Sequence, residues 1–208
     1  DDEGAPPLDP LAQIDIFANS DLDEEDPGSL AFKTRAAGDS GSMEDLEAII
    51  AEHGTRAVTY AAAKHGQLAC MRMLYSKNAA IELRRPDADG RTAVHYASCY
   101  GQAACVSFLI DLGVDASAGD RTGITPLHFA AMYGHANVIQ VLIESGVDPA
   151  VVDSEGSTPL SWATRQGHDS CVALLSAHIS RCEALQAAAR RNNAYKVHKL
   201  ADQHTSMV

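Results

Sequence analysis

The 208-residue sequence lacks any long apolar run. Its longest candidates, such as 57–63 and 138–143, fall far short of the roughly 18 residues that a membrane-spanning helix needs. Direct membrane insertion is therefore excluded. With 46% apolar and 21% charged residues, the composition is typical of a globular protein rather than of a wholly disordered chain.

Basic residues are absent from the first 29 positions, which hold ten Asp and Glu residues. Residues 30–208 carry 18 acidic against 16 basic residues, so the net charge of −12 belongs mainly to the N-terminus. Nucleic-acid binding needs a basic surface that neutralises phosphates. Neither the whole chain nor its nearly neutral body has such a balance, and we expect no nucleic-acid partner.

Paired cysteine motifs are missing as well. The five cysteines are odd in number and none forms a Cys-x-x-Cys pair, which argues against a disulfide framework or a zinc knuckle. We expect an intracellular, reducing compartment, with the cytoplasm first and an organelle reached after N-terminal processing as the alternative. The chain begins at Asp1 without a basic-then-apolar leader. A shortened start and a processed start both stay open.

Motifs that carry catalysis are also absent. The sequence has no nucleophile elbow, Walker loop, His-Glu-x-x-His or dinucleotide-binding glycines. Four histidines that invite a metal or catalytic interpretation, His95, His128, His135 and His168, fall at repeated positions, so we expect structural roles for them. We therefore predict no enzyme activity, metal or cofactor. Cys99 falls on a variable position and is our candidate for a reactive thiol.

The sequence instead repeats itself with a period of 33 residues. A fixed period of this length is typical of stacked repeat architectures. Four residue types recur in one register: Asp87, Asp120 and Asp153; Gly90, Gly123 and Gly156; Thr92, Thr125 and Thr158; and Gly101, Gly134 and Gly167.

One unit shows the local chemistry of the repeat. Asp120 and the Gly that follows it are typical of a tight turn. Thr125 followed by Pro126 predicts a helix that Thr caps and Pro begins. Apolar residues at helical spacing over 138–142 predict a second helix, which ends at Gly146. Each unit is expected to form a helix, a turn, a second helix and then a hairpin.

The unit from Asp120 to Asp148 closely resembles the ankyrin repeat, and residues 87–179 carry this resemblance through three units. It implies an all-α ankyrin-repeat solenoid of about six helix-turn-helix units, with degenerate units capping both ends. The spacing at the two ends leaves no room for fingers. Three short hairpin fingers are expected, near 87–91, 120–124 and 153–157.

The array is expected over 30–202, between an acidic N-terminal extension (1–29) and a C-terminal tail (203–208). In the first unit, the Gly-rich stretch 38–42 predicts a lengthened loop between the helices. The last unit is predicted from its apolar offsets, although Asn192 stands where the other units have Gly. The expected units cover about 30–54, 55–80, 87–115, 120–148, 153–179 and 181–202.

The resemblance implies a non-enzymatic protein–protein interaction module that binds through the concave face of first helices and finger tips. Aromatic and Arg side chains, which interfaces favour, fall on these positions. For the row of Tyr96, Phe129 and Trp162, packing between helices is the alternative. The candidate contact residues are Tyr96, Tyr100, Phe129, Met132, Tyr133, Trp162, Arg165, Arg121, Arg91, Asp89 and Glu155.

The acidic extension indicates a second function. Residues 9–17 predict a short helix, with Asp9 and Pro10 at its start. The extension either lies along the array's own surface, toward the basic end around Arg181 and Arg190, or docks on another protein. In the second case the chain would be a constitutive structural subunit of a larger assembly, anchored by this arm.

Overall fold

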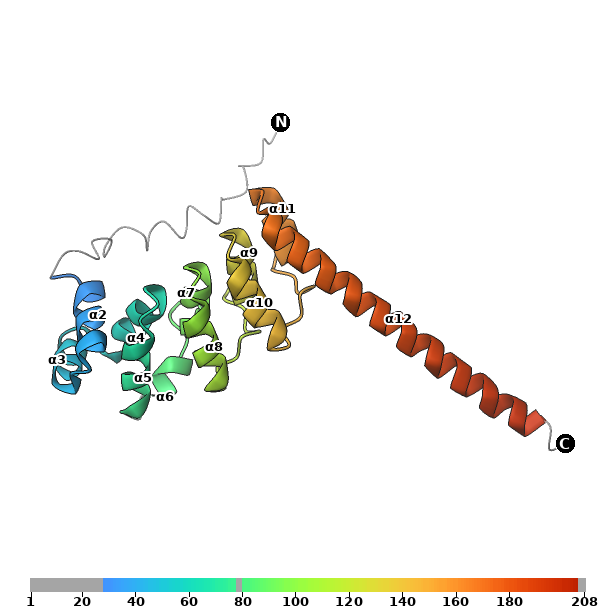
Figure 1. The fold of residues 1–208 in the computed structure, drawn as a ribbon, viewed down its shortest axis with the longest axis horizontal. Coiled ribbons are helices and arrows are strands. Elements are labelled where there is room, and N and C mark those ends of the chain that lie inside the picture. Colours follow the sequence, from blue (N-terminus) through green and yellow to red (C-terminus); the bar gives the residue numbers. More distant parts are fainter. Residues whose placement is uncertain (1–27, 78–79, 206–208) are drawn as a thin grey trace.

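The computed structural model describes residues 28–77 and 80–205 and shows a row of paired helices followed by one long helix (Figure 1). No strand occurs within these two ranges, which confirms the all-helical prediction. The short helix predicted over 9–17 lies outside the described residues.

The helices follow one another in pairs along the row. Their bounds are α2 (Leu30–Ser40), α3 (Met43–His53), α4 (Thr55–Lys64), α5 (Leu68–Ser76), α6 (Ala80–Arg84), α7 (Ala93–Cys99), α8 (Ala103–Asp111), α9 (Pro126–Met132), α10 (Ala136–Glu144), α11 (Pro159–Gln166) and α12 (Asp169–Thr205).

The pair α9 and α10 shows why each repeat folds as it does. Thr125 is extended before the helix, and its backbone N–H donates to Nδ1 of His128 at 3.2 Å. Pro126 takes the first helical position, where no backbone N–H is needed. Gly134 turns the chain with a φ of 76°, which a side chain would strain. The local chemistry therefore matches the prediction.

The core runs through the whole row without a break. Small residues such as Ala97, Ala130 and Ala163 are fully buried on the first helices α7, α9 and α11, where they let neighbouring helices approach closely. Larger residues such as Leu109 and Leu142 are fully buried on the second helices. Each repeat therefore completes its core only against its neighbours.

Polar bridges connect each repeat to the one before it. A side chain that follows the mid-repeat Gly donates to a backbone carbonyl at the preceding unit. These bridges are Gln67 Nε2 to Ala31 (2.8 Å), Gln102 Nε2 to Lys64 (3.2 Å), His135 Nε2 to Cys99 (2.9 Å) and His168 Nε2 to Met132 (2.9 Å).

The three fingers form as predicted. In the second finger, the N–H of Asp120 donates to the carbonyl of Ile124 at 2.9 Å and closes the turn. The fingers also bond to one another, because the N–H of Arg121 donates to Asp89 O and that of Ser154 donates to Thr122 O, both at 2.9 Å. The fingers therefore form one continuous ribbon beside the helices.

The first helix pair differs from the predicted unit in direction and in its turn. Three bridges reach the end of the preceding first helix, but Gln67 reaches Ala31, at the start of α2. The start of α2 thus lies where other first helices end, so α2 runs in reverse. The lengthened loop predicted over 38–42 is wrong, since α2 continues to Ser40 and Gly41 turns the chain with a φ of 67°.

The separate sixth unit predicted over 181–202 is not formed. α12 runs unbroken from Asp169 to Thr205 and projects away from the array (Figure 1). The stretch contains neither Gly nor Pro, and Asn192 can continue a helix where the other repeats turn at Gly. The fifth repeat ends the stack instead, and exposed Ser161 and Thr164 give α11 a polar outer side.

Candidate interaction surface

The fingers and the first helices α4, α7, α9 and α11 present one continuous surface, which we call the inner face. At its base, one oxygen of each finger aspartate holds its own turn. Oδ1 of Asp153 accepts from the N–H groups of Glu155 (3.0 Å) and Ser157 (2.8 Å). Asp87 and Asp120 do the same in their fingers. These aspartates are therefore structural residues of the inner face.

The second oxygen of the first and third finger aspartates accepts a bond from the aromatic residue nine positions later. Tyr96 Oη donates to Asp87 Oδ2 at 2.6 Å, and Trp162 Nε1 donates to Asp153 Oδ2 at 3.0 Å. The constant spacing was visible in the sequence, but we did not predict this pairing.

In the second finger, the second oxygen of the aspartate accepts its hydrogen bond from a different kind of donor. Phe129 stands nine residues after Asp120 and has no polar atom to donate. Arg91, from the preceding finger, donates its Nε to Asp120 Oδ2 at 3.2 Å instead. Burial opposes ionisation of Asp120, but hydrogen bonds from Thr122 and Arg91 outweigh it and lower its pKa. The Asp120 carboxylate therefore stays ionised, and the positive charge of Arg91 beside it balances its negative charge.

Three predicted contact residues are buried. Phe129, Met132 and Trp162 are each only 2% exposed. As they stand, they offer almost no surface to a partner. Tyr96 is half-buried and stacks on Tyr60 with ring centroids 4.8 Å apart. Packing, the alternative considered for this row, accounts for its observed contacts.

Cations lie directly over the aromatic rings. Arg91 lies over Phe129 at 5.5 Å and Arg165 lies over Trp162 at 4.6 Å. The Lys64 ammonium group lies 5.1 Å from the ring centre of Tyr100. These distances suit cation–π attraction. The aromatic residues thus hold positive charges in place along the inner face.

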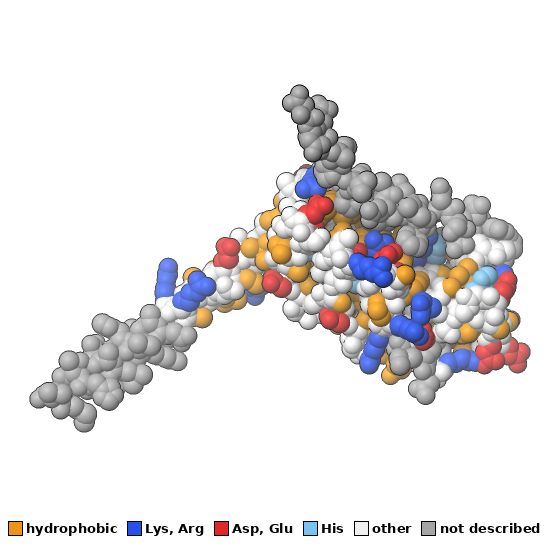
Figure 2. Space-filling view, turned by 180° about the vertical axis from the view of Figure 1, so that it is seen from behind, with side chains coloured by type: hydrophobic (Ala, Val, Ile, Leu, Met, Phe, Trp, Pro, Cys, Tyr) orange, Lys and Arg blue, Asp and Glu red, His pale blue; other side chains and the backbone are white. Residues whose placement is uncertain are grey.

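The remaining predicted residues lie nearer the solvent. Tyr100 and Tyr133 are half-buried at the ends of α7 and α9, and Tyr133 stacks on His135 with centroids 6.4 Å apart. Arg121 and Glu155 are exposed on their fingers, Arg165 is exposed on α11, and Asp89 is half-buried. Lys and Arg side chains are scattered over the array in the view from behind (Figure 2).

The repeated histidines are part of the framework. Nδ1 of His128 accepts from Thr125, and its Nε2 donates to the carbonyl of Ser157 at 3.0 Å. Burial lowers the pKa of His128, and it lowers that of His95 to about 4. Both imidazoles are therefore neutral near pH 7, and Nδ1 of each accepts a hydrogen bond from the backbone N–H of the Thr that caps its helix.

Four of the five cysteines are poor nucleophiles where they lie. Burial raises the pKa of Cys70, Cys105 and Cys171. It also raises the pKa of Cys99 to about 12, so this thiol stays protonated near pH 7. Because the thiolate is the reactive form, the environment of Cys99 does not favour the reactive-thiol role considered from the sequence.

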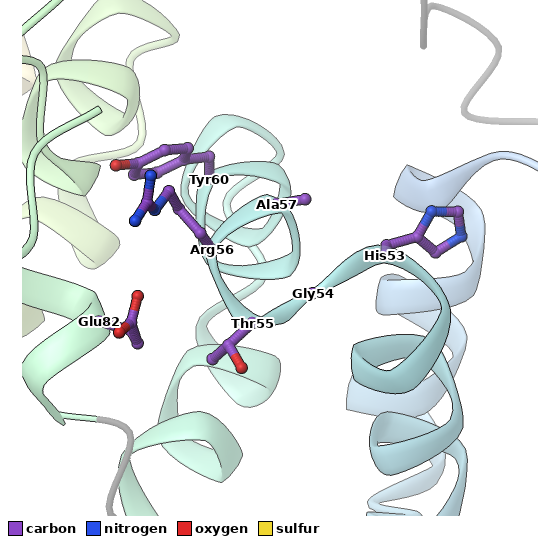
Figure 3. A pocket seen from close by; sticks show the side chains of 7 residues that line it. All are labelled: His53, Gly54, Thr55, Arg56, Ala57, Tyr60 and Glu82. Atoms are coloured by element: carbon purple, nitrogen blue, oxygen red, sulfur yellow. The ribbon is translucent and has the colours of Figure 1, made fainter. Parts of the chain in front are cut away.

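A depression of about 570 Å³ opens where α3 joins α4 without a finger (Figure 3). Arg56 and Tyr60 extend from α4 on the side of Glu82, whereas the His53 ring points away (Figure 3). Tyr60 Oη donates to the carbonyl of Arg85 at 3.0 Å. The titratable groups of this depression therefore do not converge on one point as a catalytic site requires.

Two absences concern only the part of the chain that the structure describes. There, no three His, Cys, Asp or Glu side chains gather so that they could hold a metal ion. Nor is any helix there both long and apolar enough to cross a membrane.

The chain matches a family model described as ankyrin repeats (3 copies) over two overlapping stretches, residues 35–120 and 112–184. A comparison with curated proteins finds no match. The matched stretches span most of the chain and include the repeated helix pairs, the fingers and the inner face. The chain therefore belongs to the ankyrin repeat family, whose repeats generally serve as protein–protein interaction modules and are typically non-enzymatic.

Proposed function

We propose that this chain is a non-enzymatic module that binds a partner protein through its inner face. One observation carries the proposal: the finger aspartates are buried and hydrogen-bonded, whereas two arginines of the same face are exposed. Asp120 and Asp153 are each 7% exposed and hydrogen-bonded. Arg121 and Arg165 are exposed. The inner face therefore offers exposed arginines to a partner, because the finger aspartates of the same face already accept hydrogen bonds from other residues.

The aromatic residues add to this surface. Tyr100 and Tyr133 occupy equivalent positions on successive first helices, directly before Gly101 and Gly134. Tyrosine buries a large area with few rotatable bonds, which suits the centre of an interface. A partner segment with carboxylates for the arginines and apolar side chains for the tyrosines matches this chemistry.

The test is a quantitative pull-down from native extract with the intact chain and two charge-reversed variants. The inner-face variant carries Arg121→Glu and Arg165→Glu. The matched control carries Arg72→Glu and Arg181→Glu, which reverse two exposed arginines on α5 and α12. Circular dichroism and thermal unfolding establish that all three proteins are folded to the same extent.

We expect the dominant partner to fall at least tenfold with the inner-face variant and to stay within twofold of the intact chain with the control. The affinity measured with the purified partner should likewise fall more with the inner-face variant than with the control. Equal recovery with both variants would refute the proposed binding face, because its two exposed arginines would then contribute nothing specific.

A further inference from the structure

We propose that the acidic N-terminal segment, residues 1–27, binds along the inner face of its own chain and competes there with the partner. The competition with the partner rests on the proposed function, whereas the contact between the segment and the inner face does not. The segment lies outside the described residues, and its composition, its attachment point and the inner face supply the argument.

Charge is the first reason. The segment holds all ten acidic residues of the N-terminal extension and no Lys or Arg. The inner face holds Lys64 and Arg165 over aromatic rings, and exposed Arg121 on a finger. Opposite charges on a tethered segment and its own chain attract without the cost of bringing two molecules together.

The attachment point is the second reason. Gln67 donates to the carbonyl of Ala31, which places the start of α2 beside the turn between α4 and α5. The equivalent turns of later repeats follow Tyr100, Tyr133 and Gln166. Because α2 runs in reverse, the segment leaves the array in line with this row of turns rather than at its far side.

Length is the third reason. Neighbouring helices lie about 10 Å apart, so the row from α2 past α4, α7 and α9 to α11 spans about 40 Å. An extended chain covers about 3.3 Å per residue. About 12 residues therefore reach α11, and the segment has more than enough.

These spacings also predict a register. Counting back from Gly28 at about three residues per helix, Leu22 falls near Tyr100 at the end of α7. Phe17 falls between Tyr133 and Arg165, at the ends of α9 and α11. The acidic run over 21–26 then lies beside Lys64, and the apolar side chains meet the tyrosines.

The basic part of α12 is the competing site, since it carries Arg190 and Arg191. It projects away from the array at the end opposite to α2 (Figure 1). The segment would have to pass the whole inner face to reach it. The inner face is therefore the nearer cationic surface for residues 15–26.

The test places a photo-crosslinking amino acid, p-benzoylphenylalanine, at position 22 or 17 of the full chain. Mass spectrometry then identifies the crosslinked residues. We expect position 22 to crosslink within about 97–103 and position 17 within about 130–136 or 162–168, in the monomer fraction. Crosslinks to α12, to a second copy of the chain, or to the second helices α5, α8 and α10 would overturn the proposal.

Two charge variants sharpen the result. Lys64→Glu with Arg165→Glu should reduce the crosslink yield at least fivefold, whereas Arg190→Glu with Arg191→Glu should leave it within twofold. The yield should also fall in 0.5 M NaCl, where charges are screened beyond about 4 Å. Equal yields in both variants would overturn the electrostatic basis of the contact.

A separate experiment tests competition. Asp21, Asp23 and Asp26 are changed to Asn and Glu24 and Glu25 to Gln in the full chain, and partner affinity is measured. We expect at least fivefold tighter binding. If the expected crosslinks form but the affinity for the partner is unchanged, the contact between the segment and the inner face is retained and competition is refuted. Loss of the crosslinks with an intact partner site would refute this inference alone.

Discussion

Trp162 donates its indole Nε1–H to Oδ2 of Asp153 at 3.0 Å, and both side chains are buried. One bond thus connects a first helix to the finger that precedes it. A buried carboxylate that loses its partner costs more than an exposed one, because water cannot replace the lost donor.

Trp162→Phe should therefore lower the free energy of unfolding by about 2–3 kcal/mol. Tyr96→Phe removes the equivalent bond to Asp87, which is only half-buried, and should cost about 1 kcal/mol. Urea unfolding of both variants checks the order. A larger loss for Tyr96→Phe would contradict the argument from burial.

Two glycines with the same backbone conformation separate strain from steric contact. Gly134 and Gly167 have φ angles of 76° and 74°. A Cβ on Gly134 would lie 2.7 Å from Nδ1 of His168, whereas a Cβ on Gly167 would meet nothing within 4 Å. Gly167→Ala should cost roughly 1–2 kcal/mol from strain alone.

Gly134→Ala should cost about 1 kcal/mol more, because His168 must move and lose its bond to the carbonyl of Met132. Thermal unfolding measures both single variants. In the background of His168→Ala, the extra cost should disappear. If the two glycine variants were equally stable, the bridge between repeats would not resist displacement.

Mild acid should destabilise the fold through His95. Burial lowers the pKa of His95 to about 4 in the folded state, against about 6.5 in an unfolded chain. The unfolded state therefore binds the proton first as the pH falls. The stability from the neutral imidazole is complete above pH 6.5 and is lost progressively between pH 6.5 and 4.

Between pH 7.5 and 5, this residue alone should remove about 2 kcal/mol of stability. His95→Gln keeps a side-chain acceptor near Thr92 but does not titrate, so its stability should fall by about 2 kcal/mol less over the same range. Urea titrations at both pH values provide the measurement. Parallel pH profiles for the two proteins would exclude His95 as the group responsible.

The two ends of α12 should differ in their contribution to stability. Leu175 is fully buried against the array, whereas Leu185 is 64% exposed. Leu175→Ala should cost about 2–5 kcal/mol, and Leu185→Ala should stay within about 0.5 kcal/mol of the intact chain. Chemical denaturation of the two variants tests this. A large loss at Leu185 would mean that the projecting part packs on something in solution.

The 33-residue period was enough to predict the fold, the three fingers and most helices. Asp, Gly, Thr and Gly in one register fix a turn, a helix start and a second turn, and few other structures satisfy all three. The errors came where this register was incomplete. The sixth unit was predicted from apolar spacing alone, and one continuous helix satisfies the same spacing.

The reversed α2 could not be recognised from the sequence for a related reason. A spacing of three or four residues between apolar positions is the same when read in either direction. The apolar spacing of the first unit therefore matches a repeat's first helix even though the chain runs the other way. Its direction is set by tertiary contacts, such as the bond from Gln67 to Ala31.

The candidate site was predicted only in part. Its rows of positions follow from the repeat, so Arg121, Arg165, Tyr100 and Tyr133 could be named before the structure. Which row is buried depends on how neighbouring repeats stack, and an aromatic residue suits either environment. The pairing of Trp162 with Asp153 shows the signal that was available, since a donor and a carboxylate recur nine residues apart.

The bonds from Arg121 to Asp89 and from Ser154 to Thr122 mean that the three finger tips cannot change their spacing independently. A binding partner therefore meets finger tips that stand at fixed distances from one another. Little conformational freedom remains to be lost when two fingers are contacted at once, which favours tight binding by a rigid match. The same rigidity should reject a partner whose contact points are spaced even slightly differently.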